Sequence, residues 1–168
     1  MHNRRGFTLI ELLVTIAIIG LLATLGIVAF NTARIRARDA RRTSDIRAIQ
    51  TALEIFRGSV GGYPDDTVSG AGGSAIGGGN LRSLTRSGWG GALPAGVAVY
   101  LGQAPNDPAP GGSGQYTYTS RADDGSSCDA TPCDTYVIQF SLEQGTGGLS
   151  AGTYCASPPG TINAGACP

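Results

Sequence analysis

Hydrophobic residues dominate the start of the chain and form one uninterrupted run. The run covers 24 residues, Phe7 to Phe30, and Glu11 is its only charged residue. About 20 apolar residues are enough for a helix to cross a bilayer, so the run predicts a membrane-spanning helix. A secretory signal peptide has a shorter apolar region and a small-x-small cleavage site, and this run has neither. A carboxylate in such a span costs roughly 2.5–3.5 kcal/mol, so Glu11 predicts a functional role and a partner.

The pattern then changes to helical periodicity without a turn. Residues 34–57 contain neither Gly nor Pro, and their apolar positions recur at intervals of three, four and three. This spacing gives one apolar stripe on an amphipathic helix, made of Ile46, Ile49, Leu53 and Phe56. We therefore expect one helix from about Phe7 to Arg57, roughly 77 Å long at 1.5 Å per residue. Its first half faces lipid or other subunits, and its second half lays the stripe on a soluble domain.

Beyond Arg57, short alternating segments and glycine replace the helical pattern. The expected elements are a Gly-rich loop over 69–79, a short helix beginning within 81–84, a helix or a strand over 95–101, strands over 115–119, 136–142 and 153–156, and an irregular tail over 158–168. Period-2 alternation and β-branched or aromatic residues support the three strands. Trp89 lies in a glycine setting and is either a loop anchor or an exposed contact.

The junction between the basic leader and the apolar run is the most specific motif of the chain. Its residues, Gly6-Phe7-Thr8-Leu9-Ile10-Glu11-Leu12-Leu13, resemble the N-terminal motif of the type IV pilin and pseudopilin family. The resemblance implies cleavage between Gly6 and Phe7 by a membrane prepilin peptidase, followed by N-methylation of Phe7. It also implies assembly into a helical filament, in which Glu11 of one subunit neutralises the Phe7 amine of a neighbour.

Two weaker similarities to the same family follow. Gly61-Gly62-Tyr63-Pro64 resembles the Gly-x-Tyr-Pro after the long helix of pseudopilins, and the later strand order resembles their C-terminal sheet. The resemblance implies an α+β, pilin-like fold, in which a long N-terminal helix packs on a small antiparallel sheet. The expected parts are a cleaved leader over 1–6, the helix over 7–57 with its transmembrane half over 7–30, and a Gly-rich soluble domain over 58–168. Gly20 and Gly26 fit close helix packing or, as the family implies, local unwinding in a filament.

Charge is unevenly distributed although the net charge is zero. Residues 1–57 hold nine Arg and four acids, whereas residues 58–168 hold three Arg and eight acids, which we expect on the surface. The acidic soluble part lacks the basic patch that nucleic-acid binding needs. The chain has no Lys, and its only His is His2 in the leader. Histidine triads, histidine bases and histidine metal ligands are therefore excluded from the mature chain. We expect neither a cofactor nor enzymatic activity.

A basic row follows the apolar run, at Arg34, Arg36, Arg38, Arg41 and Arg42. The bias of membrane proteins toward positive cytoplasmic flanks would place this row in the cytoplasm. The resemblance instead places the leader on that side, which requires family-specific targeting to override the bias. Such a row also fits a nucleic-acid site on composition alone, but we favour a solvated helix face beside the membrane.

All four cysteines, Cys128, Cys133, Cys155 and Cys167, lie in the last third of the chain. An even count in a translocated domain predicts disulfides, and we expect the sequence neighbours to pair, although three pairings are open. A zinc site is disfavoured because Cys-x2-Cys knuckles are absent.

Clustered acids raise the question of a calcium site. Asp123, Asp124 and Asp129 are calcium candidates because hard cations take carboxylate oxygens. No EF-hand spacing is present, so we favour a polar turn for this segment and expect no metal.

These observations predict a structural subunit of a pilus-like filament. Its expected partners are copies of itself, a prepilin peptidase, the filament assembly machinery and the membrane before assembly, while nucleic acid is disfavoured. The precursor is expected in the inner or cytoplasmic membrane with its soluble domain outside, and the filament at the cell surface or in the periplasm. Two alternatives remain open, namely a pseudopilin of a type II secretion system and a competence pilin for DNA uptake.

Overall fold

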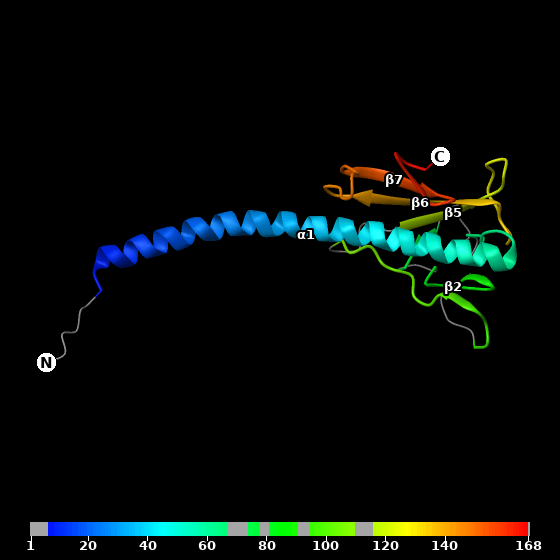
Figure 1. Ribbon diagram of the computed structural model, residues 1–168, viewed down its shortest axis with the longest axis horizontal. Coiled ribbons are helices and arrows are strands. Elements are labelled where there is room, and N and C mark those ends of the chain that lie inside the picture. Colours follow the sequence, from blue (N-terminus) through cyan, green and yellow to red (C-terminus); the bar gives the residue numbers. More distant parts are fainter. Residues whose placement is uncertain (1–6, 67–73, 78–80, 91–94, 110–115, 168) are drawn as a thin grey trace.

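One long helix organises the molecule. The computed structural model describes residues 7–66, 74–77, 81–90, 95–109 and 116–167, and helix α1 runs over Leu9–Val60 for 52 residues. Its N-terminal half projects away from the rest of the chain, and its C-terminal half lies along the soluble domain (Figure 1). Gly61 ends the helix in the left-handed region at φ 96°, where its N–H reaches the carbonyl of Arg57. Glycine suits this position because it has no Cβ.

The predicted apolar stripe of α1 forms the centre of the core. The side chains of Ile46, Ile49, Leu53 and Phe56 are all fully buried, which confirms the spacing argument. Burying each such side chain contributes about 1.5–3 kcal/mol. Amphipathic packing of this half therefore attaches α1 firmly to the domain.

A five-stranded antiparallel sheet covers one side of the stripe. Its order is β1-β5-β6-β7-β8, with β1 at Ser74–Ile76, β5 at Tyr116–Arg121, β6 at Thr135–Leu142, β7 at Gly152–Ser157 and β8 at Thr161–Ala164. Alternate residues of β5 are buried, so Tyr116, Tyr118 and Ser120 face the core. This period-2 pattern is what a sheet with one packed face requires.

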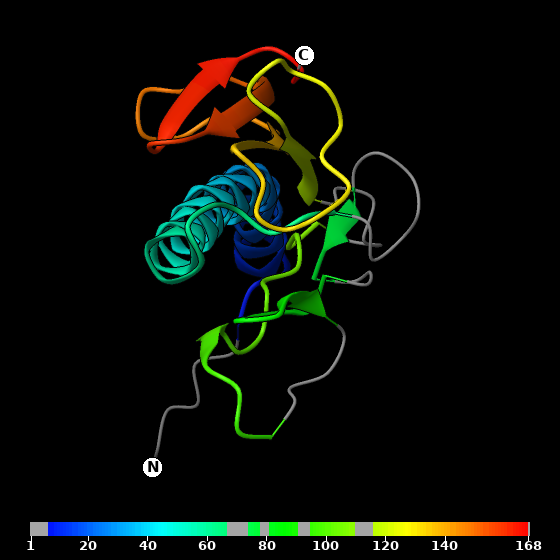
Figure 2. The same cartoon turned by 90° about the vertical axis from the view of Figure 1, so that its right-hand side faces the viewer.

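A smaller sheet lies on another side of the helix. It has the order β3-β2-β4, with β2 at Ser83–Thr85, β3 at Gly88–Gly90 and β4 at Val99–Leu101. Figure 2 looks along α1 and shows the packed half of the helix between these green strands and the larger sheet. Trp89 of β3 is 5 % exposed, and its ring packs edge-to-face with that of Tyr118, with 5.5 Å between the ring centroids. It is therefore a core anchor rather than an exposed contact.

The structure confirms the α+β fold and corrects three local predictions. Residues 83–85 are a strand rather than part of a short helix, and Ser74–Ile76 forms a strand inside the segment predicted as a Gly-rich loop; residues 69–73, 78 and 79 of that segment lie outside the described residues. The tail is also not irregular throughout, because Thr161–Ala164 pairs with β7. All three strands have three or four residues, and pairing with a neighbour decides their structure more than their own composition does.

Candidate assembly site

The projecting half of α1 is an apolar surface that no other described residue covers. An 18-residue window of this helix has a mean hydropathy of 2.7, and none of the window is buried. Phe7 is 74 % exposed, and the side chains of Leu9 and Phe30 near its two ends are 82 % and 65 % exposed. Monomeric soluble proteins do not leave apolar surfaces of this size in water. By length and composition this segment can cross a membrane, and it needs lipid or other helices around it.

Glu11 lies at the start of α1, where it belongs to a capping box. The Thr8 hydroxyl accepts from the Glu11 backbone N–H at 3.4 Å, and the Glu11 carboxylate accepts from the Thr8 backbone N–H at 3.4 Å and from its hydroxyl at 3.2 Å. This arrangement satisfies two donors that a helix start otherwise leaves unpaired. It also leaves the carboxylate exposed one turn after Phe7. The Thr8-x-x-Glu11 spacing before an apolar run is the sequence signal for this cap.

The predicted cleavage position falls at the edge of what the structure describes. Gly6 and the rest of the leader, residues 1–6, lie outside the described residues. Phe7 is the first described residue, and it precedes the helix cap at Thr8.

A buried ionic cluster joins the middle of α1 to the domain, and we call it the junction cluster. Its centre is Asp39, whose side chain is fully buried and accepts from the backbone N–H groups of Glu143, Gln144 and Gly145 at 3.0, 2.8 and 2.8 Å. Arg42 donates a fourth hydrogen bond at 2.7 Å. Burial alone would raise the pKa of Asp39, but the three backbone donors and Arg42 outweigh it and hold the pKa below its ordinary value.

Arg42 completes the junction cluster from the same helix. Its side chain is 3 % exposed and pairs with Asp107 at 3.0 Å and with Glu143 at 2.8 Å. Arg38 holds Glu143 from the neighbouring turn through two hydrogen bonds at 2.8 and 2.5 Å, and the Arg38 hydrogen bond is the main reason that the pKa of Glu143 is lowered. The cluster therefore connects α1 both to the β6–β7 turn and to the 105–108 segment.

The junction cluster corrects two expectations about charge. The basic row is a solvated face at Arg34, Arg36 and Arg41, but Arg42 is buried. The expectation of surface acids likewise fails at Asp107, whose side chain is 4 % exposed, and also at Asp66, which is 5 % exposed. The Asp39–Arg42 spacing of three residues was visible in the sequence as a helical ion pair. Nothing local marked Asp107 or Glu143 as its partners, because these contacts are long-range.

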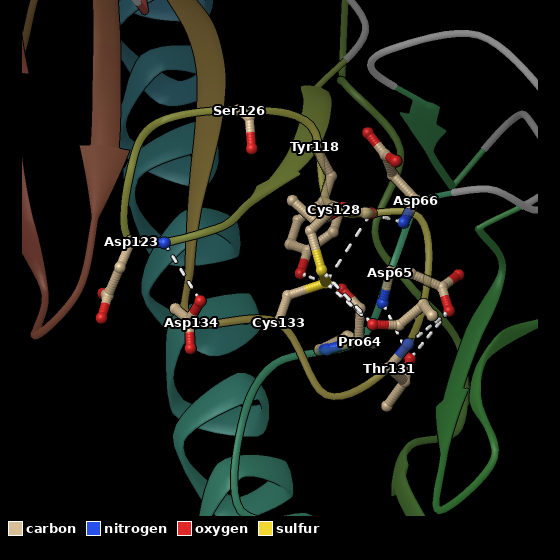
Figure 3. Close-up of a disulfide and its surroundings, with 12 residues drawn as sticks. Pro64, Asp65, Asp66, Tyr118, Asp123, Ser126, Cys128, Thr131, Cys133 and Asp134 are labelled. Atoms are coloured by element: carbon tan, nitrogen blue, oxygen red, sulfur yellow. Dashed lines mark hydrogen bonds between the residues drawn. A yellow bond between two sulfur atoms is a disulfide. The ribbon is translucent and has the colours of Figure 1, made fainter.

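At the far end of the domain a disulfide pins a loop beside the end of α1. Cys128 and Cys133 are joined, with 5.9 Å between their Cα atoms. Cys133 exchanges two backbone hydrogen bonds of 2.8 Å with Tyr63. Figure 3 shows Asp65 and Thr131 facing one another across this contact. The Asp65 N–H donates to the Thr131 hydroxyl at 2.9 Å, and the Thr131 N–H donates to the Asp65 carboxylate at 3.0 Å.

The Gly-x-Tyr-Pro segment acquires a structural role from this contact. A Cβ at Gly62 would lie 2.6 Å from the Cys133 carbonyl oxygen and 2.6 Å from the Pro132 Cβ. Tyr63 is 1 % exposed, and the Tyr118 hydroxyl donates to the Pro64 carbonyl at 2.6 Å. The segment therefore lets the chain leave α1 and pass closely beneath the disulfide loop.

The calcium candidates lie on the same loop but are not arranged as a cation site. The Asp124 carboxylate accepts from the N–H and hydroxyl of Ser126 at 2.9 and 2.6 Å, which is the geometry of an acid that closes its own turn. The Asp123 N–H donates to Asp134 at 3.0 Å, as Figure 3 shows. Asp129 is exposed. Among the described residues no group of three or more His, Cys, Asp or Glu side chains is placed to hold a metal.

The second cysteine pair fastens the C-terminal segment to the sheet. Cys155 of β7 is joined to Cys167, with 5.0 Å between their Cα atoms. Both cysteine pairs are therefore the sequence-neighbour pairs. The Cys167 N–H also lies 3.4 Å from the Gln139 side-chain oxygen of β6.

Comparison with known proteins agrees with the geometry of α1. Residues 1–27 match the family described as "Prokaryotic N-terminal methylation motif". No solved structure matches the chain. Two curated relatives match part of the chain. A "Fimbrial protein" of Pseudomonas aeruginosa is 41 % identical over 54 residues, which is 32 % of this chain and 35 % of that protein. The "Type IV major pilin protein PilA" of Myxococcus xanthus (strain DK1622) is 38 % identical over 63 residues, 38 % of this chain and 29 % of that protein.

The chain thus spans about a third of the length of these two relatives. A further relative is matched over more of its length. "Fimbrial protein Q" of Moraxella bovis is 34 % identical over 107 residues, which cover 59 % of this chain and 68 % of that protein. Three findings agree with one another, namely the exposed apolar helix that carries the methylation motif, the α+β domain and this extended match. The chain belongs to the type IV pilin family.

Proposed function

We propose that this chain is the structural subunit of a type IV pilus and polymerises through α1 after its leader is removed. The observation that carries the proposal is the wholly exposed apolar half of α1. In the precursor, lipid covers this surface. In the filament, the same surface is buried against the α1 helices of other copies while the soluble domains form the coat. The named relatives, which are fimbrial proteins and a major pilin, favour a pilus over a secretion pseudopilus.

Pairing of charges would set the register between subunits. Cleavage after Gly6 frees the amine of Phe7, which is positive, and the Glu11 carboxylate of a neighbour would neutralise it. An unpaired charge inside an apolar helix bundle is costly, so the pair selects one register more than it adds stability. The proposed role of the subunit is structural, and it requires neither catalysis nor a cofactor.

Assembly of Glu11 variants tests the proposal. Glu11→Ala and Glu11→Gln, each expressed as the sole subunit, should insert into the membrane normally, because a costly charge is gone from the span. Both should yield far fewer sheared filaments, because the Phe7 amine then enters the bundle unpaired, a loss of about 3–5 kcal/mol per subunit. Thr8→Ala is the matched control. It breaks the capping box, worth about 1 kcal/mol, but keeps the charge, so it should still assemble. Normal filaments from both Glu11 variants would refute the pairing.

Processing supplies an independent test. We infer that a prepilin peptidase removes residues 1–6 and that Phe7 is then N-methylated. The intact mass of filament protein should match a chain that starts at Phe7 plus one methyl group. Gly6→Val should block cleavage while leaving membrane insertion intact. Filaments that retain Met1 would contradict this step.

A further inference from the structure

Two arginines next to the apolar half of α1 take no part in the assembly proposal. Arg34 and Arg36 are both exposed. Among the described residues, neither has an acidic group within ion-pair distance, whereas Arg38 and Arg42 in the following turns are paired. Fold stability therefore does not account for the two charges, and the bias of membrane proteins would exclude them from the translocated side.

Their height on the helix places them at the surface of a membrane. Arg34 lies four residues beyond Phe30 and Arg36 six, which is about 6 and 9 Å at 1.5 Å per residue. The headgroup region adds about 5–8 Å on each side of a 30 Å hydrocarbon core. The Arg34 guanidinium lies 5.2 Å from the centroid of the Phe30 ring, so it already sits where the apolar surface ends. Long arginine side chains at helix ends adopt this position with the stem on apolar surface and the charge in the headgroups.

The wall of the protein beside Arg36 contributes no unpaired acid among the described residues. Arg36 and Thr32 line an open hollow together with the β6–β7 turn, residues 143–149. The one acid on this wall is Glu143, and Arg38 and Arg42 already neutralise it. An anionic group entering the hollow therefore meets the Arg36 guanidinium, a hydroxyl and the backbone of a glycine-rich turn.

We propose that Arg34 and Arg36 bind the phosphates of anionic lipids while the subunit is held in the membrane. The inference rests on the membrane stage of the proposed function and does not need the filament. A second copy is the rival partner, because exposed acids occur on the 122–134 loop. That loop is attached to Tyr63, about 40 Å along α1 from Arg34. Among the described residues, a neighbour in the membrane at the same height brings only Glu143 to this level, and its own Arg38 and Arg42 already pair with that acid. Lipid phosphates, in contrast, surround the two arginines in every precursor.

Lipid retention by the full-length chain in nanodiscs tests the proposal. The discs contain phosphatidylcholine with one part in five of phosphatidylglycerol, and native mass spectrometry counts the lipids of each kind that stay bound after detergent release. Each arginine near an anionic surface is worth about 1 kcal/mol, or roughly five-fold in relative binding. The wild type should enrich phosphatidylglycerol over its share, and in Arg34→Gln/Arg36→Gln the ratio of bound phosphatidylglycerol to bound phosphatidylcholine should fall at least five-fold.

Two further variants make the result specific. Arg47→Gln/Arg86→Gln removes the same charge from exposed positions outside the headgroup level and should keep the enrichment. Arg34→Lys/Arg36→Lys keeps the charge and should retain most of it. Equal retention in the wild type and in the 34/36 glutamine variant would overturn the proposal, as would an equal loss in the 47/86 control. If the 34/36 variant keeps its lipids but its copies no longer cross-link in the disc, the two arginines contact a second subunit instead. Failure of filament assembly with intact lipid selectivity would reject the filament proposal alone.

Discussion

Replacing Asp39 by Asn is expected to destabilise the domain more than any other single change to a polar side chain of α1. The carboxylate accepts four hydrogen bonds, three from the backbone of the β6–β7 turn and one from Arg42. An Asn offers one acceptor oxygen and turns an N–H₂ group toward donors. Each buried donor left unpaired costs about 1–3 kcal/mol, and breaking a buried charge pair costs about 3–5 kcal/mol. We expect a loss of about 3–5 kcal/mol from a total free energy of unfolding of about 5–15 kcal/mol.

Urea unfolding of the full-length chain in detergent micelles measures this loss. Trp89 is the only tryptophan and lies in the core, so its fluorescence reports the domain. With a slope of about 2 kcal/mol per molar urea, the midpoint should fall by about 1.5–2.5 M. Asp45→Asn is the matched control on the same helix. Burial raises the pKa of Asp45, and its hydrogen bond from the Tyr116 hydroxyl at 3.0 Å is one that an amide oxygen also accepts. The control should lower the midpoint by less than 0.5 M, which at this slope corresponds to a loss of about 1 kcal/mol in the free energy of unfolding. A shift as large as that of Asp39→Asn would refute the reasoning.

Three further predictions concern acid, close packing and covalent links. The pKa of Asp39 is lowered in the folded state. The carboxylate therefore stabilises the fold above about pH 4, and this stabilisation is lost as the pH falls through the pKa of the folded state. Urea midpoints at pH 7, 4 and 2.5 should fall less steeply with pH in Asp39→Asn than in the wild type. Gly62→Ala should cost about 1–3 kcal/mol of stability by overpacking. Gly58→Ala should be neutral or stabilise by up to about 1 kcal/mol, because a Cβ there meets nothing within 4 Å. The same urea assay ranks the two variants, and the reverse order would contradict the close contact at Gly62. Non-reducing peptide mapping should recover Cys155 linked to Cys167, and replacing both by Ser should cost on the order of 3 kcal/mol; free thiols in the native protein would exclude the link.

The features that the sequence predicted well are those in which local pattern and tertiary role coincide. The stripe from Ile46 to Phe56 is buried as its spacing requires, because helical periodicity alone determines which face is apolar. The strand β5 was predicted for a similar reason, since its alternation reflects one packed face. β6 and β7 were predicted from their β-branched and aromatic residues, and three consecutive residues are buried within each. Family resemblance, rather than spacing, supplied the roles of Phe7 and Glu11.

The features that were missed depend on contacts distant in sequence. β2 and β8 are three and four residues long, too short for alternation to be recognised, and their pairing partners decide them. Arg42 resembled the other arginines of its row until Asp107 and Glu143 were placed beside it, 65 and about 100 residues away. Its burial could not be inferred from local composition, because charged residues are buried only where such partners exist.

The continuity of α1 has a mechanical consequence. The same helix is exposed in its first half and packed against the domain in its second, with no break between the two halves. No flexible linker therefore separates them that could extend when the N-terminal end is pulled. Among the described residues, the first hydrogen bonds from α1 to the domain are those of Arg38 and the junction cluster, which attach the β6–β7 turn and the 105–108 segment to the helix. A force pulling on the N-terminal end of α1 is therefore carried first by the several hydrogen bonds and ion pairs of the junction cluster. The hydrophobic core, which lies further along the helix, experiences the force only after them.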